Sequence, residues 1–146
     1  KKLQSQLELF TVSIPGGVKI SNDDPEYSFK YVSEQFANIL GYATPKELLD
    51  ASGGNIIGLE GANLTVARDG LQAVRMFQEK PEGYFDAILM DIIMPVMDGI
   101  TAAKTIRLLK HPDAETIPII AMTANAFRED KEKCLAAGMN AHLAKL

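Results

Sequence analysis

Residues 85–99 read FDAILMDIIMPVMDG, and this stretch decides the fold. Its first six residues are almost all apolar, which is typical of a strand buried on both faces of a parallel sheet. Asp91 follows directly, and Pro95 and Gly99 come before an amphipathic stretch over about residues 100–110. The sequence therefore predicts a buried strand, a loop that begins with a carboxylate, and a helix.

The same alternation of strand and helix continues on both sides of this stretch. Further strands are expected at residues 62–67, 118–122 and 141–145, and further helices at residues 71–78 and 127–137. Short apolar strands that alternate with helices are typical of βαβ units with right-handed crossovers. We therefore expect an α/β fold, a doubly wound parallel sheet with helices on both faces.

The composition is that of one globular domain of ordinary size. The 146 residues include 15 Lys+Arg and 19 Asp+Glu, for a net charge of -4, and 47% are apolar. Two complete domains of about 100–150 residues would not fit, and the negative charge disfavours nucleic acid as a direct partner. Cys134 is the one cysteine, so no internal disulfide is expected. No apolar run approaches the roughly 20 residues of a membrane span, so we expect a cytoplasmic location.

Three side chains suited to phosphoryl chemistry end successive predicted strands. They are Asp91, Thr123 and Lys145, and the carboxyl ends of parallel strands meet at one edge of a sheet. A carboxylate can attack phosphorus when a divalent cation neutralises the incoming charge. A hydroxyl and an ammonium group can bind the oxyanion. Each residue alone also fits an ordinary turn, cap or strand position, but their joint occurrence favours a site.

Residues 61–146 resemble the receiver domain of two-component response regulators. The matching blocks are ARDGLQAV at residues 67–74, DIIMPVMDG at 91–99, PIIAMTA at 118–124 and GMNAHLAK at 138–145. The resemblance implies a flavodoxin-like sheet. It also implies a signalling function, in which phosphorylation shifts the population of a binding surface.

The resemblance implies roles for four residues of the longest block, DIIMPVMDG at residues 91–99. Asp91 would accept a phosphoryl group from the phosphohistidine of a histidine kinase or phosphotransfer protein. Asp91 and the backbone carbonyl of Ile93 would bind Mg²⁺. Pro95 and Gly99 would shape the loop that brings this backbone to the metal.

The later blocks would supply the residues that respond to phosphorylation. Thr123 would turn toward the phosphoryl oxygens, and Lys145 would pair with them and, before that, with Asp91. His142 stands where the family often has an aromatic residue that rotates between inward and outward poses. For His142, a plain strand position facing solvent or a neighbouring helix is an equally good interpretation.

The first sixty residues depart from the receiver pattern. A complete receiver begins with a strand that ends in adjacent acids and ends with a helix after a Lys-Pro pair, but here Leu146 follows Lys145. Residues 1–60 instead resemble the first half of a PAS sensor domain, most clearly in ILGYATPKELL at residues 39–49. We therefore expect a partial PAS-like α+β segment at residues 1–60. Residues 61–146 would be an incomplete receiver that lacks its usual first strand and helix and its last helix.

Local signals divide the PAS-like segment into smaller elements. Leu3, Leu7 and Phe10 share a helical face. A strand is expected within residues 27–32, and helices are expected after the caps Ser33 and Thr44. The join near residue 60 could be natural, or it could reflect a chimera or omitted residues.

One alternative places part of this segment in the receiver sheet. Val18–Ser21 is a candidate strand, and Asp23 and Asp24 follow it. This strand could fill the missing first position of the sheet, so that Asp23 or Asp24 binds the metal. The same acidic pair also fits a simple turn before Pro25.

Two functions of different classes stay open. The first is a phosphoacceptor module of a phosphorelay, excerpted from a hybrid sensor histidine kinase; the chain has no kinase motif of its own. The second is a PAS-type ligand-sensing or dimerisation module that is not phosphorylated. An exposed sheet edge would favour a homodimer in either case.

Overall fold

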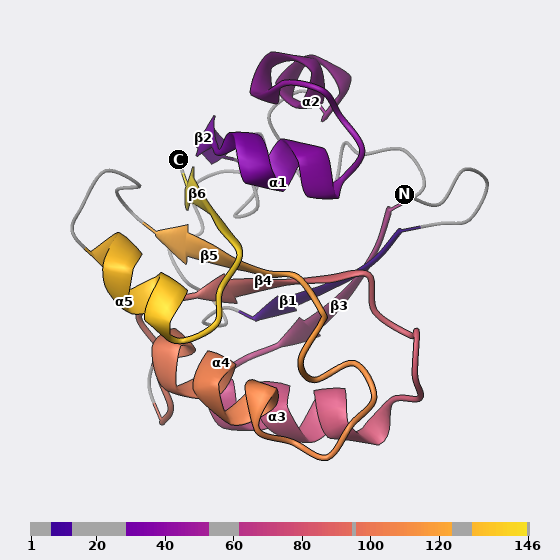
Figure 1. Cartoon of the computed structure of the whole chain (residues 1–146), viewed down its shortest axis with the longest axis vertical. Helices are drawn as coiled ribbons and strands as arrows, with labels where there is room; N and C mark the ends of the chain where they lie inside the picture. The colour runs from indigo at the N-terminus through magenta and orange to yellow at the C-terminus, as the bar shows by residue number, and fades with distance from the viewer. Residues whose placement is uncertain (1–6, 13–28, 53–61, 95, 124–129, 146) are drawn as a thin grey trace.

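The computed structural model describes residues 7–12, 29–52, 62–94, 96–123 and 130–145. One central sheet has helices on both faces (Figure 1). The strands are β1 (Leu7–Val12), β2 (Phe29–Val32), β3 (Ala62–Ala67), β4 (Ala87–Asp91), β5 (Ile119–Thr123) and β6 (Ala141–Lys145). The helices are α1 (Glu34–Ile39), α2 (Pro45–Ser52), α3 (Gly70–Glu79), α4 (Gly99–Arg107) and α5 (Asp130–Ala136). Within these ranges, no helix has the length and apolar character that a membrane crossing requires.

The strand order of the sheet is β2-β6-β5-β4-β1-β3. All neighbours pair in parallel except β2, which lies antiparallel to β6 at one edge. Without β2, the order β3-β1-β4-β5-β6 is that of a flavodoxin-like doubly wound fold. The predicted fold class is therefore confirmed for the parallel part of the sheet.

Strand β1 corrects two expectations about the start of the chain. It lies between β3 and β4, with Thr11 opposite Val66 on one side and Leu89 on the other. The prediction that Leu7 and Phe10 lie on a helical face is therefore wrong. The residues of β1 from Leu9 to Val12 are all buried, and a strand buried on both faces lacks the alternating pattern that identifies strands in a sequence.

The sheet is also complete rather than incomplete. Residues 62–145 contribute β3, β4, β5 and β6, and β1 supplies the fifth parallel strand. Because β1 occupies the position between β3 and β4, Val18–Ser21 does not fill it. Val18–Ser21, Asp23 and Asp24 lie outside the described residues. The first sixty residues and the rest of the chain thus share one sheet, while the exact division between two segments stays a prediction.

Each face of the sheet has its own apolar core. On the face covered by α3, α4 and α5, the ring of Phe85 stacks on Phe10, with 4.5 Å between ring centroids, and on Phe77, with 6.4 Å. On the other face, α1 and α2 bury Phe36 and Leu48 against the strands. Figure 1 shows these two helices above the sheet and α3 and α4 below it. The helices of the first sixty residues are therefore part of the core.

Hydrogen bonds of Ser33 join helix α1 to strand β6. As predicted, Ser33 is the N-cap of α1, because its Oγ accepts from the backbone N–H of Phe36 at 3.2 Å. The backbone N–H of Ser33 donates to the carbonyl of His142 at 3.2 Å, and the N–H of His142 donates to Ser33 Oγ at 3.4 Å. The start of α1 is thus fixed to the edge region of the sheet.

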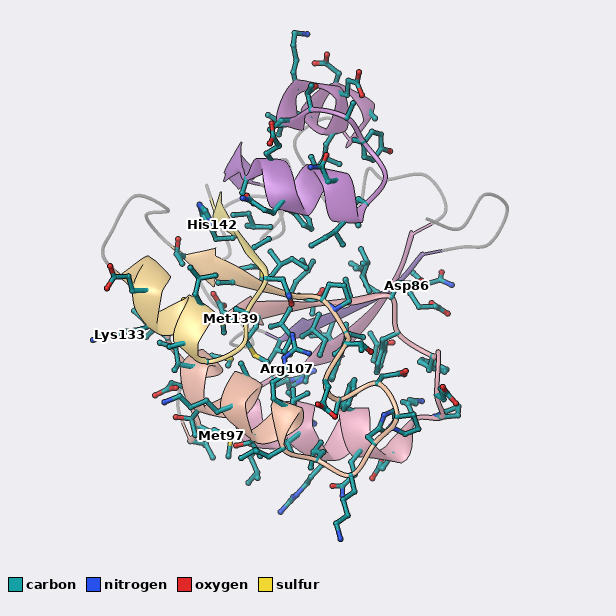
Figure 2. The ribbon with its side chains drawn as sticks, in the orientation of Figure 1. Asp86, Met97, Arg107, Lys133, Met139 and His142 are labelled. Atoms are coloured by element: carbon teal, nitrogen blue, oxygen red, sulfur yellow. The ribbon has the colours of Figure 1, made fainter. Side chains whose placement is uncertain are left out.

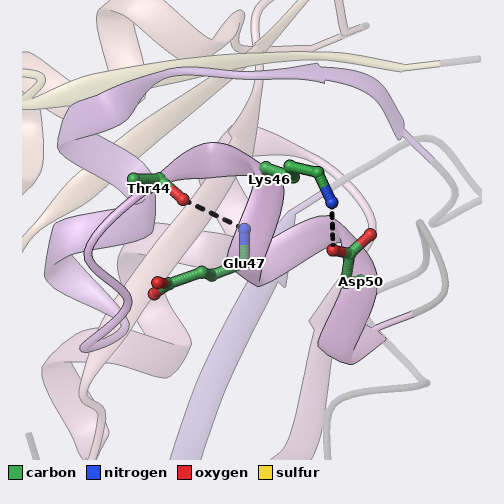
Figure 3. Close-up of polar contacts among 4 residues, drawn as sticks. All are labelled: Thr44, Lys46, Glu47 and Asp50. Atoms are coloured by element: carbon green, nitrogen blue, oxygen red, sulfur yellow. Dashed lines mark hydrogen bonds and ion pairs between the residues drawn. The ribbon is translucent and has the colours of Figure 1, made fainter.

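Helix α2 begins with a reciprocal cap. Thr44 Oγ1 accepts from the N–H of Glu47 at 3.2 Å (Figure 3), and Glu47 Oε2 accepts from the N–H of Ala43 at 3.1 Å. Such a cap satisfies two donors at the start of the helix. The exposed Lys46 Nζ lies 2.8 Å from Asp50 Oδ2, and this hydrogen bond raises the pKa of Lys46. A surface pair of this kind stabilises little, so the cap and the buried Leu48 define the helix.

Arg107 joins the end of α4 to the start of β5 and β6 (Figure 2). Its guanidinium donates to the carbonyl of Gly138 at 2.7 and 3.0 Å, to the carbonyl of Ala114 at 3.0 Å and to Asn140 Oδ1 at 2.8 Å. Partial burial lowers the pKa of Arg107. Gly138 has the positive φ of 96° that its position after α5 predicts.

Replacing the buried ring of α1 tests whether the N-terminal helices support the sheet. Phe36→Ala is expected to lower the free energy of unfolding by about 3–5 kcal/mol, because the ring is fully buried between α1 and the strands. Urea denaturation followed by circular dichroism measures this loss. Gln35→Ala, on the exposed side of α1, should stay within about 0.5 kcal/mol of the wild type. Equal stabilities of the two variants would contradict the packing of α1.

Candidate functional site

The candidate site lies at the carboxyl ends of neighbouring strands. Asp91 is the last residue of β4 and is buried, with 6% of its surface exposed. Thr123 ends β5 and Lys145 ends β6, and the order β6-β5-β4 makes these three strands direct neighbours. The structure therefore places the three predicted strand ends at one edge of the sheet, as parallel pairing requires.

The three residues expected to respond to phosphorylation differ in what the structure describes of them. Thr123 Oγ1 is buried and has no hydrogen-bond partner among the described residues. The backbone of Lys145 pairs with Phe29, and the side chain of Lys145 lies outside the described part. His142 is half-buried on β6 below α1 (Figure 2), and its backbone bonds to Ser33. Their predicted roles stay predictions.

Close backbone approaches hold the loop between β4 and α4. The N–H of Gly99 donates to the carbonyl of Ile92 at 2.9 Å, and a Cβ at Gly99 would lie 2.0 Å from the carbonyl oxygen of Asp91. A Cβ at Gly70, the first residue of α3, would lie 2.4 Å from the carbonyl oxygen of Met97. The loop thus packs against its own start and against α3. Pro95, the other predicted loop-shaping residue, lies outside the described residues.

Two apolar side chains of this loop point into solvent. Ile93 is 80% exposed and Val96 is 77% exposed, whereas Met94 between them is buried in the core. Val96 also has a φ of 69°, which is strained for a β-branched residue. Backbone strain of this kind persists only where surrounding contacts impose it, and it is enriched at functional sites.

The donor atoms near Asp91 fit a magnesium ion in kind but are few. The Asp91 carboxylate and the backbone carbonyl of Ile93 are hard oxygen donors, which Mg²⁺ prefers. Val12, the last residue of β1, is followed in the sequence by Ser13 and Ile14, so the adjacent acids that end the first strand of a complete receiver are missing there. Within the described ranges, no three His, Cys, Asp or Glu side chains gather as a metal cluster. Mg²⁺ bound here would keep most of its waters.

Thr11 is a polar residue at this edge that the sequence analysis misses. It is the penultimate residue of β1 and is 0% exposed, and within the described ranges its Oγ1 has no hydrogen-bond partner. It lies in the stretch that is expected to be helical, so its place beside β4 is not evident from the sequence. The β-branched pair Thr11-Val12 is the signal that favours a strand there.

Comparison with known families identifies the domain type. Residues 46–146 match the family model of the response regulator receiver domain. The chain belongs to this family. The match begins at Lys46, inside the segment expected to resemble a PAS domain, so that resemblance stays a prediction. As a receiver domain, the chain is of the type that serves two-component phosphorelay systems.

The curated relatives are large kinases of which the chain matches a small part. Hybrid signal transduction histidine kinase I of Dictyostelium discoideum is 40% identical over 87 residues, which are 58% of this chain and 5% of the kinase. Signal transduction histidine-protein kinase BarA of Escherichia coli K12 is 50% identical over 76 residues, 52% of this chain and 8% of the kinase. The chain is therefore homologous to receivers of such kinases.

Solved receiver structures have the same fold along nearly the whole chain. The receiver domain of a sensor histidine kinase from Pseudomonas aeruginosa, with a magnesium ion coordinated in its active-site cleft, is 30% identical. It aligns with a TM-score of 0.56 over 96% of this chain and 85% of the other. Chemotaxis protein CheY4 of Vibrio cholerae is 19% identical and aligns with a TM-score of 0.59 over 96% of this chain and 87% of the other. At 19% identity, the likeness to CheY4 concerns the fold alone.

Adding a methyl group at Gly99 tests the packing of the loop. Gly99→Ala is expected to lower the free energy of unfolding by about 1–3 kcal/mol, because its Cβ would collide with the carbonyl oxygen of Asp91. The amide resonances of Asp91 and Ile92 should also shift in a ¹⁵N–¹H NMR spectrum. Thr101→Ala, on the exposed side of α4, is the control and should change neither. Unchanged stability and resonances in Gly99→Ala would disprove the close approach.

Proposed function

We propose that Asp91 accepts a phosphoryl group from a phosphohistidine and that the phosphorylated domain presents an altered binding surface. The observation that carries this proposal is the position of Asp91, a buried carboxylate at the carboxyl end of a central strand in a member of the receiver family. Ligands of open α/β sheets bind at this edge.

The transfer itself is a displacement at phosphorus. A carboxylate oxygen of Asp91 attacks the phosphorus atom and forms an acyl phosphate, while the bond from phosphorus to the imidazole nitrogen of the donor breaks. The electron pair of that bond stays on the imidazole nitrogen, which takes up one proton from solvent. With this proton, atoms and charge balance.

Mg²⁺ would be held by the Asp91 carboxylate, the Ile93 carbonyl and an oxygen of the phosphoryl group. Bound there, the metal neutralises charge on the transferred group. Asp23 or Asp24 would add a second carboxylate if either reached the metal, although β1, and not Val18–Ser21, occupies the strand position between β3 and β4. With few protein oxygens, affinity for Mg²⁺ should be low when no phosphoryl group is present.

The switch follows from the charge that the acyl phosphate adds. A phosphoryl group has about −1.5 to −2 charge and strong acceptor oxygens. Thr123 would donate a hydrogen bond to these oxygens. Its buried hydroxyl has no hydrogen-bond partner among the described residues, which supports this role. Lys145 would pair with the oxygens from β6. His142, half-buried on β6 and joined through its backbone to Ser33, would pass the change to α1.

The partners proposed are a histidine kinase or a phosphotransfer protein, in keeping with the kinases to which the chain is homologous. We also propose that residues 1–60 derive from a PAS domain and that the chain corresponds to part of a hybrid histidine kinase.

The ligand-sensing alternative is less well supported, because Phe36, Leu40 and Leu48 are used to cover the sheet. A homodimer would be expected to form through an exposed sheet edge. The outer edge of β6 is covered within the chain, because it pairs with β2.

Chemical phosphorylation tests the role of Asp91. The wild type, incubated with acetyl phosphate and increasing Mg²⁺, should gain the mass of one phosphoryl group by intact-mass spectrometry. Asp91→Asn should gain none, because the amide is a poor nucleophile. Labelling should rise with Mg²⁺ without saturating at low concentration, as expected for a weak site.

The matched control for this experiment is Asp86→Asn. Asp86 precedes the opposite end of β4, where its Oδ2 accepts from the N–H of Glu8 at 2.8 Å, and an asparagine keeps an oxygen that can accept this bond. It should be labelled as the wild type is. Equal labelling of Asp91→Asn and the wild type would rule out Asp91 as the phosphoacceptor.

A further inference from the structure

Two buried hydroxyl groups lie on either side of the strand that ends in Asp91. Among the described residues, Thr11 Oγ1 and Thr123 Oγ1 are the buried side-chain polar atoms without a hydrogen-bond partner. Thr11 belongs to β1 and Thr123 to β5, and these are the two neighbours of β4 in the sheet. The proposed function uses Thr123 and leaves Thr11 without a role.

The alternation of side chains places Thr11 on the same face of the sheet as Asp91. Successive residues of a strand point to opposite faces. In β1, Leu9 belongs to the core below α1 and α2, and in β4 Leu89 belongs to the same core. Thr11 and Asp91 each follow two residues later, so they share that face.

The register of the strands makes Thr11 and Asp91 diagonal neighbours. Thr11 is opposite Leu89, and Asp91 lies two residues further along β4. Parallel strands lie about 4.8 Å apart and rise about 3.3 Å per residue, so the Cα atoms of this diagonal pair lie about 8 Å apart. This separation is too long for a direct hydrogen bond between a threonine and an aspartate, but one water molecule can bridge it.

The buried Thr11 hydroxyl has no hydrogen-bond partner among the described residues, and an ordered water would satisfy it. A valine has nearly the same shape and would fill this position without an unsatisfied polar group. Leaving a buried hydroxyl unpaired is unfavourable, and buried polar groups of this kind commonly bond to an ordered water with two to four polar partners. Among the described residues of β1, β3 and β4, Asp91 is the nearest acidic residue on that face by register.

We propose that Thr11 holds an ordered water against the Asp91 carboxylate and so positions this carboxylate for phosphoryl transfer. The inference rests on the proposed function of Asp91. One carboxylate oxygen accepts from the water, and the other is directed to the incoming phosphorus. The water is neither consumed nor deprotonated, so the displacement balances as before. Thr11 is a positioning residue and does not touch the phosphoryl group.

Three variants test this role by the rate of labelling with acetyl phosphate at fixed Mg²⁺. Thr11→Val should lower the rate constant by about tenfold, the effect of one lost hydrogen bond, while its thermal unfolding midpoint stays the same or rises. Thr11→Ser keeps the hydroxyl and should be labelled within about twofold of the wild type. Thr65→Val is the same change on β3, where the residue is half-buried, and should be labelled at the wild-type rate.

The labelling results distinguish failure of this inference from failure of the proposed function. If the wild type is labelled and Thr11→Val is labelled equally fast, the inference is wrong and the proposed function stands. If Thr11→Val and Thr11→Ser are equally slow, packing explains the effect and the water bridge is wrong. A wild type that is never labelled overturns the proposed function and this inference with it. Should Thr11→Val fail to fold, a high-resolution crystal structure of the wild type decides: a water bonded to Thr11 Oγ1 and Asp91 supports the bridge, and its absence overturns it.

Discussion

The pairing of β1 with both β3 and β4 is the constraint on which the rest of the structure depends. β1 completes the hydrogen-bonded ladders of two strands, and its side chains enter both cores, with Leu9 on one face and Phe10 and Val12 on the other. Without it, β4 would be an edge strand. Asp91 would then lie at a solvent-exposed edge of the sheet, where electrostatic interactions with neighbouring groups are weak.

The described parts of the first sixty residues belong to the sheet or pack on it. β1 lies inside it, α1 and α2 cover one face, and β2 pairs with the outer edge of β6. A long connection therefore separates β1 from β3, the next parallel strand along the chain. The entropy of closing a loop grows only slowly with its length, so a connection of this length is compatible with a receiver sheet. The segment also shields an edge that would otherwise be open to pairing.

The sequence predicts those parts of the fold whose signals lie within a short stretch of the chain. The strand at β4 and the positions of Asp91 and Thr123 follow from local signals, since a buried run and the residue that ends it are adjacent in the chain. β1 does not follow, because burial on both faces removes the alternation, and the spacing of Leu3, Leu7 and Phe10 also fits a helix. Thr11 is missed for the same reason: its importance comes from a register between distant strands, which no local pattern encodes.

Amide hydrogen exchange of β1, measured by NMR on the intact chain, tests the central place of this strand most directly. A central strand opens only in the global unfolding reaction. The amides of Phe10, Thr11 and Val12 should therefore exchange as slowly as those of Leu89 and Met90 in β4. Exchange of the β1 amides at the rate of exposed loops, while β4 stays protected, would contradict the place of β1 in the sheet and the site built on it.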